Sequence, residues 1–139
     1  MFVTYRPEGG EERRWTFDPR RVRASRAEMI ERRAGEPYEA WLTSVQAGKT
    51  HARRVLLWHL LSLEHPGLKF EDTPDFYMDE LIVEHSVSEL EELKSRVQRA
   101  NIPSDQRETI LAALEIEIAE AEQREKERGG GEGKAKSRS

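Results

Sequence analysis

RRVLLWHLLSLEHPGLKFED, at residues 53–72, is the stretch of sequence that decides the fold of this chain. Seven of the nine residues from Val55 to Leu63 are apolar, so no single apolar stripe describes them. A helix that is apolar on nearly every side has to be surrounded by other elements. We therefore expect a helix over 51–64 at the centre of the core, ended by Pro66 and Gly67.

The N-terminal residues predict a short β-hairpin ahead of this helix. Residues 2–6 and 13–17 read as two strands, and alternation in the second puts Trp15 and Phe17 on one face. The glycines between them supply turn chemistry. An isolated hairpin is barely stable in water, so we expect it to lie on the helices.

Apolar spacing and start signals predict several further helices. Their approximate ranges are 26–33, 38–47, 75–83, 86–101 and 105–127. Ser25 and Ser86 each stand three residues before a glutamate, which is the spacing of a capping box. The range 75–83 is the least regular, because it ends in β-branched residues. The last helix carries one apolar stripe, which can pack on its own domain or on another chain.

These elements together predict a mainly α fold with a short N-terminal β-hairpin, in the α+β class. A small helical bundle surrounds the apolar helix 51–64, and a long C-terminal helix and a disordered tail follow it. The expected parts are a hairpin at 1–24, a helical core domain at 25–102, an amphipathic helix at 103–128 and a tail at 129–139. The tail is glycine-rich and charged, and it cannot bury enough apolar surface to offset its ordering entropy.

Composition excludes several classes of function. The chain has no cysteine, which rules out disulfides, thiol catalysis and zinc–thiolate sites. The N-terminus does not resemble a signal peptide, and the longest apolar run is about half of the roughly 20 residues that a membrane span needs. We therefore expect a cytoplasmic protein without a membrane partner. Charge is uneven, with +3 over residues 1–33 and −9 over residues 64–92, which favours charged partner surfaces or self-association.

The sequence gives little support for a catalytic, metal-binding or nucleic-acid-binding site. None of the four histidines has the helical spacing of a zinc pair, and His59 reads either as a ligand or proton shuttle or as a histidine at the edge of the core. The acidic residues at 71–80 lack the pattern of a calcium loop and predict a solvated surface or a protein-contact face. We expect no catalytic residue, no metal and no cofactor. Nucleic acid is an unfavoured partner. A small DNA-binding or packaging protein remains an alternative, because Arg20, Arg21 and Arg23 could contact phosphates and Trp15 and Phe17 resemble an aromatic platform on which bases stack.

One resemblance covers the block from Trp41 to Val83. Its features are Trp41, the apolar helix at 55–61, and the run HPGLKFED at residues 65–72. In this order they resemble the tail assembly chaperones of long-tailed, siphovirus-type bacteriophages, the lambda-type tail chaperone group. An N-terminal tryptophan near a strand, like Trp15, is also similar.

The resemblance implies a non-enzymatic protein of the host cytoplasm. Such a chaperone binds the helical tape measure protein and keeps it soluble for tail tube assembly, and it is absent from the finished virion. The tail tube protein is a further candidate partner. Many members are made in two lengths by a programmed frameshift, and Glu132-Gly133-Lys134 is compatible with the slippery codons GAG-GGA-AAR.

A bound helix would lay its apolar face in a groove. The residues predicted to contact this partner are Trp41, Val45, Leu57 and Trp58 in the core region and Ile110, Leu114 and Ile118 on the last helix. A structural head–tail or other virion component is the alternative function, beside the DNA-binding or packaging protein. The oligomeric state, the binding face and the packing of the last helix are left open by the sequence.

Overall fold

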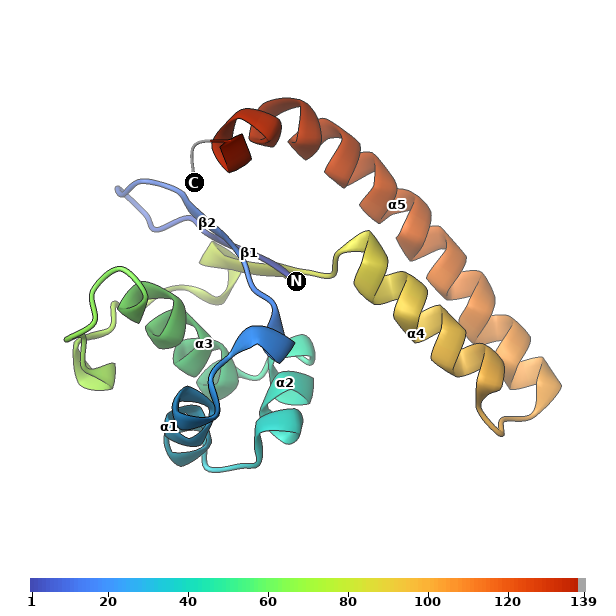
Figure 1. Cartoon of the computed structure of the whole chain (residues 1–139), viewed down its shortest axis with the longest axis horizontal. Helices are drawn as coiled ribbons and strands as arrows, with labels where there is room; N and C mark the ends of the chain where they lie inside the picture. Colours follow the sequence, from blue (N-terminus) through green and yellow to red (C-terminus); the bar gives the residue numbers. More distant parts are fainter. Residues whose placement is uncertain (138–139) are drawn as a thin grey trace. The chain divides into compact units, whose positions relative to one another are not determined.

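The computed structural model describes residues 1–137, with side chains through residue 128. The chain divides into two compact units, residues 1–84 and the part from residue 85 onward. Figure 1 shows the strands and helices α1–α3 in the first unit and helices α4 and α5 in the second. The predicted boundaries after residues 24 and 102 differ from this division, which keeps the β-hairpin with α1–α3 and groups α4 with α5.

Three short strands form an antiparallel sheet in the order β2-β1-β3. Their bounds are Phe2–Tyr5 for β1, Arg13–Thr16 for β2 and Leu81–Glu84 for β3. Val3 in the central strand lies opposite Trp15 on one side and Val83 on the other, and Tyr5 lies opposite Leu81. Side chains alternate across a strand, so these residues share one face, on which Val3, Tyr5 and Leu81 are buried.

The third strand corrects the helix expected over 75–83. A single 3₁₀ turn, η3 (Met78–Glu80), leads directly into β3. β2 covers only one edge of β1, so the other edge offers backbone groups that β3 can pair with. Where β1 and β3 meet, the Arg6 amide donates to the Glu80 carbonyl at 2.8 Å. The β-branched side chains of Ile82 and Val83 suit a strand better than a helix. Pairing with residues nearly 80 positions away thus overrides the helical spacing.

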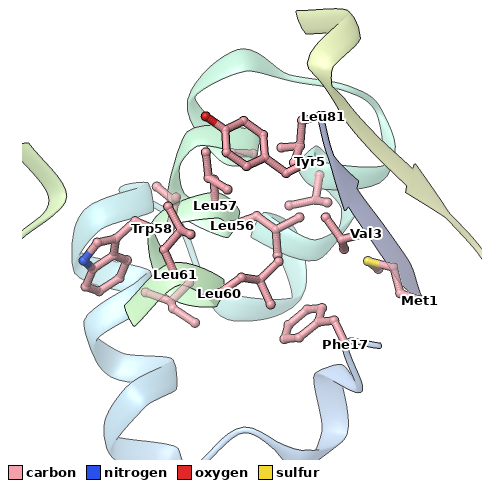
Figure 2. Close-up of a cluster of buried hydrophobic side chains, with 14 of the residues drawn as sticks. Met1, Val3, Tyr5, Phe17, Leu56, Leu57, Trp58, Leu60, Leu61 and Leu81 are labelled. Atoms are coloured by element: carbon pink, nitrogen blue, oxygen red, sulfur yellow. The ribbon is translucent and has the colours of Figure 1, made fainter. Parts of the chain in front are cut away.

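Three helices pack beside this sheet as the expected bundle. They are α1 (Ala24–Ala34), which follows the 3₁₀ turn η1 (Pro19–Arg21), α2 (Tyr38–Gln46) and α3 (Thr50–Ser62). Every residue of α3 from Val55 to Ser62 is buried, as the all-round apolar pattern predicted. Figure 2 shows leucines of α3 facing Val3, Tyr5 and Leu81 of the sheet, with Phe17 beside them. The fold is mainly α with a short N-terminal β portion.

The ends of α1 test two of the sequence signals. Arg23 is the N-cap residue and makes no side-chain cap, so the capping box predicted at Ser25 is wrong. Ser25 lies inside the first turn, where its hydroxyl is past the position from which it could cap. Gly35 ends the helix with a φ of 73°, in the left-handed region that favours glycine.

The second unit is a helical hairpin of α4 (Val87–Arg99) and α5 (Ser104–Ser137), which lie side by side in Figure 1. Ser86 caps α4 through the predicted capping box: its hydroxyl accepts from the Glu89 amide at 3.2 Å, and its own amide donates to the Glu89 carboxylate at 2.8 Å. An ion pair between Lys94 and Glu115 joins the two helices farther along.

The long helix extends past its predicted end near residue 127. Backbone in helical conformation continues to Ser137, where the sequence predicts a disordered tail, and residues 138 and 139 lie outside the described residues. Once a helix is nucleated, each added residue contributes a backbone hydrogen bond without a new nucleation cost. This propagation opposes the helix penalty of about 1 kcal/mol for each glycine.

Candidate functional site

The predicted partner-binding residues of the first unit lie in its core. Trp41, Val45 and Leu57 are 0% exposed, and Trp58 is 3% exposed. The indole N–H of Trp41 donates to the Ala52 carbonyl at 3.1 Å, so its one polar group is also satisfied internally. A side chain without exposed surface cannot contact a partner. The groove predicted around these four residues is therefore wrong for this structure.

Trp58 shows how the chain after α3 closes over that core. Its indole N–H donates to the Leu68 carbonyl at 3.1 Å, and its ring meets Phe70 edge-on with centroids 6.4 Å apart. Phe70 opens the 3₁₀ turn η2 (Phe70–Asp72). The run at 65–72 that carries part of the family resemblance thus acts here as a cover on α3.

The predicted stripe on α5 is divided by the structure. Leu114 and Ile118 are 6% and 4% exposed and form a small core with Leu90 and Ala121, whereas Ile110 is 38% exposed. The stripe packs on α4 of the same unit. Of the two alternatives that the sequence left open, its own domain or another chain, the structure shows the first. Of its three predicted residues only Ile110 offers surface to a partner.

A second apolar face on α5 was missed from the sequence. Ala112, Ile116 and Ala119 stand at i, i+4 and i+7, and all three are exposed, Ile116 at 61%. Two residues along a helix turn a side chain by about 200°, so Ile116 points away from the α4-facing side chains of Leu114 and Ile118. A helical-wheel projection of the sequence would have shown these three apolar residues on one face. The prediction followed only the longer of the two stripes.

His59 is a buried histidine at which no ligand set assembles. It is 4% exposed, its ring meets Phe17 edge-on at 5.6 Å, and its Nδ1 atom has no hydrogen-bond partner among the described residues. Burial, with a smaller contribution from the nearby positive charge of Arg26, lowers its pKa to about 4. The neutral ring is therefore part of the core at physiological pH. Among the side chains that the structure describes, no group of three or more His, Asp or Glu is placed to hold a metal ion.

The predicted aromatic stacking platform beside the N-terminal arginines does not form. Phe17 is 4% exposed and packs on Trp41 with ring centroids 6.3 Å apart. Trp15 is half-buried, and the Arg13 guanidinium covers its ring at 5.4 Å. Bases could not stack on the buried ring, so this part of the nucleic-acid hypothesis is wrong.

Other arginines of the first unit are likewise engaged with aromatic rings. The Arg26 guanidinium lies 5.0 Å from the Trp58 ring centroid, and those of Arg33 and Arg54 lie 5.6 and 5.2 Å from the Phe70 centroid. Cation–π contacts of this kind cover apolar rings with charged groups. Arg33 and Arg54 therefore cover Phe70 of the segment after α3, and Arg26 covers Trp58 of α3 itself.

Comparisons of this chain with protein-family models, curated proteins and solved structures find no match. None of the helices within residues 1–137 combines the length and the hydropathy that crossing a membrane requires.

Proposed function

We propose that this protein is a tail assembly chaperone of a long-tailed bacteriophage, which binds the helical tape measure protein and keeps it soluble. The observation that carries the proposal is the apolar face of Ala112, Ile116 and Ala119, which α4 leaves uncovered. Small side chains let a second helix approach closely, and the isoleucine gives it an apolar contact. The resemblance of residues 41–83 to tail assembly chaperones supplies the identity of the partner.

Ile110 and Leu93 are two further exposed apolar side chains of the hairpin. They are 38% and 36% exposed, on helices that meet through only a small buried cluster. A two-helix hairpin with a thin core and exposed apolar side chains is suited to accept a third helix. Such binding needs no reactive group, and it agrees with the engagement of His59 in the core.

The test is co-expression with the product of the long helical reading frame expected near this gene. The wild-type protein should keep that product in the soluble fraction, and Ile116→Glu should lose this effect because it places a charge on the contact face. Ile116 is already 61% exposed, so the substituted chain should keep its helix content, as circular dichroism can verify. Gln106→Glu is the matched control, since it adds the same charge at an exposed position of the same helix.

Three results would contradict the proposal. The partner could precipitate equally with and without the wild-type protein. Purified virions could contain this protein in stoichiometric amount, which would make it a structural component. The protein could also bind DNA with an affinity that falls with salt and is lost when Arg20, Arg21 and Arg23 become alanine, which would indicate a packaging or regulatory protein.

A further inference from the structure

A surface hollow of about 520 Å³ lies in the first unit, between the β1–β2 turn and the residues that precede β3. Three aromatic and three acidic side chains contribute to its lining: Tyr5, Phe76 and Tyr77, and Glu8, Asp75 and Glu80. A second hollow adjoins it and shares Glu8, Tyr77 and Glu80. The pair forms an acidic aromatic hollow distinct from the exposed face of α5.

Glu80 holds the walls of this hollow together. One of its carboxylate oxygens accepts from the Glu8 amide at 2.6 Å, and the other accepts from the Tyr77 amide at 2.7 Å. Tyr5 and Phe76 meet edge-on with centroids 6.4 Å apart. The shape is therefore fixed by hydrogen bonds and ring packing before any ligand arrives, which reduces the entropy cost of binding.

Tyr5 brings to the hollow a hydroxyl group that has no hydrogen-bond partner within the described protein. The residue is only 6% exposed, and its hydroxyl makes no hydrogen bond with any of the described residues. Figure 2 shows the hydroxyl directed away from Val3 and Leu81 of the core cluster. Burial, and then the negative charge of Glu80, raise the pKa of Tyr5, so the hydroxyl remains neutral and can accept a hydrogen bond. The hydroxyl is not one of the buried polar atoms that lack a partner, so it meets solvent at the hollow, and a ligand that donates to it replaces that solvent contact.

The charge of the hollow specifies which donor fits. Neither hollow has a lysine or arginine in its lining. Glu8, Asp75 and Asp79 take part in none of the ion pairs found among the described residues. Tyr77 is 69% exposed, so one of its ring faces is open to a cation. A planar guanidinium can stack on an aromatic ring while its several N–H groups donate to carboxylates and to a hydroxyl, which an ammonium does less well.

We propose that this acidic aromatic hollow binds an arginine side chain presented by an extended basic segment of another polypeptide. The guanidinium donates to the Tyr5 hydroxyl oxygen, stacks on Tyr77 and lies among the carboxylates of Glu8 and Asp75. This proposal does not depend on whether the tape measure protein is the partner of this chain.

The test is a titration of the full-length ¹⁵N-labelled protein, followed by amide chemical shifts. The probe is the peptide acetyl-Gly-Arg-Gly-amide, compared with its citrulline and lysine counterparts. Shifts should concentrate on Tyr5, Glu8 and Tyr77. Tyr5→Phe removes the hydroxyl and keeps the ring, so it should fold and weaken arginine binding by about tenfold. Asp75→Asn should weaken it by about threefold, whereas Asp72→Asn, an exposed carboxylate outside the hollow, should leave it unchanged.

Each alternative has a distinct outcome. Equal binding of citrulline would show that charge plays no part, and equal binding of lysine would remove the guanidinium preference. Unchanged affinity in Tyr5→Phe, with a spectrum that shows it folded, would overturn the role of the hydroxyl. A dimer that Asp75→Asn abolishes, without any peptide binding, would make a second copy of this chain the occupant. The titration contains no tape measure protein, so its failure and that of the chaperone proposal are separable.

Discussion

Replacing His59 with leucine should remove much of the acid sensitivity of the first unit. The ring is buried against Phe17, and its Nδ1 atom lacks a hydrogen-bond partner among the described residues. Protonation would place a positive charge in this apolar setting, close to the charge of Arg26. The folded state therefore resists protonation, whereas the unfolded chain accepts the proton at the ordinary histidine pKa.

The size of the effect follows from the two pKa values. The pKa of His59 is 6.5 in the absence of the fold and about 4 within it. This difference corresponds to about 3 kcal/mol in the free energy of unfolding. Because the folded pKa is lowered, the stabilisation is present above pH 6.5 and is lost progressively as the pH falls through about 4. Between pH 7 and pH 4, the free energy of unfolding of His59→Leu should therefore fall by about 3 kcal/mol less than that of the wild type.

Urea denaturation at several pH values, followed by tryptophan fluorescence, measures this difference. All three tryptophans belong to the first unit, so the signal reports on that unit alone. Carboxylates also titrate in this range, but they do so in both proteins, and the difference isolates His59. His65→Gln, at an exposed histidine, is the control and should keep the wild-type pH dependence. Equal losses in wild type and His59→Leu, or an NMR titration of the His59 ring near pH 6.5, would refute the reasoning.

Three further predictions concern local signals and the hairpin. Leu114→Ala should destabilise the second unit by about 2–5 kcal/mol because it opens a cavity. Ile116→Ala should cost less than about 1 kcal/mol because the side chain is largely exposed. Thermal melting followed by circular dichroism compares the two variants, and equal losses of stability would contradict the assignment of the two faces. Ser86→Ala should lower the stability of the same unit by about 1 kcal/mol through loss of the cap, and an unchanged melting curve would show that the capping box contributes little. Gly35→Ala should cost about 1 kcal/mol because its φ is positive, whereas Gly67→Ala should be nearly neutral in urea denaturation; equal midpoints for the two variants would argue against the left-handed C-cap.

The sequence predicted the elements better than it predicted the surfaces. The position of α3 in the core followed from its apolar residues alone, and the start of the helix that carries Ile110, Leu114 and Ile118 was predicted correctly, although this helix extends past its predicted end. Which of these side chains remain available to a partner did not follow. Exposure depends on which neighbour covers each face, and a periodic pattern does not name that neighbour. Trp41 and Trp58 were assigned to a groove on residue type, although buried aromatic cores have the same composition.

Amino-acid order by itself determined the features that act within a few residues: the central helix, the Gly35 stop and the Ser86 cap. Hydrogen bonding and apolar burial along one turn of helix are sufficient to establish these. Tertiary structure decided that residues 81–84 become a strand, because only the edge of β1 provides their hydrogen-bond partners. It also brought Tyr5 and Tyr77 to one hollow, since residues 72 positions apart meet only after the sheet has formed.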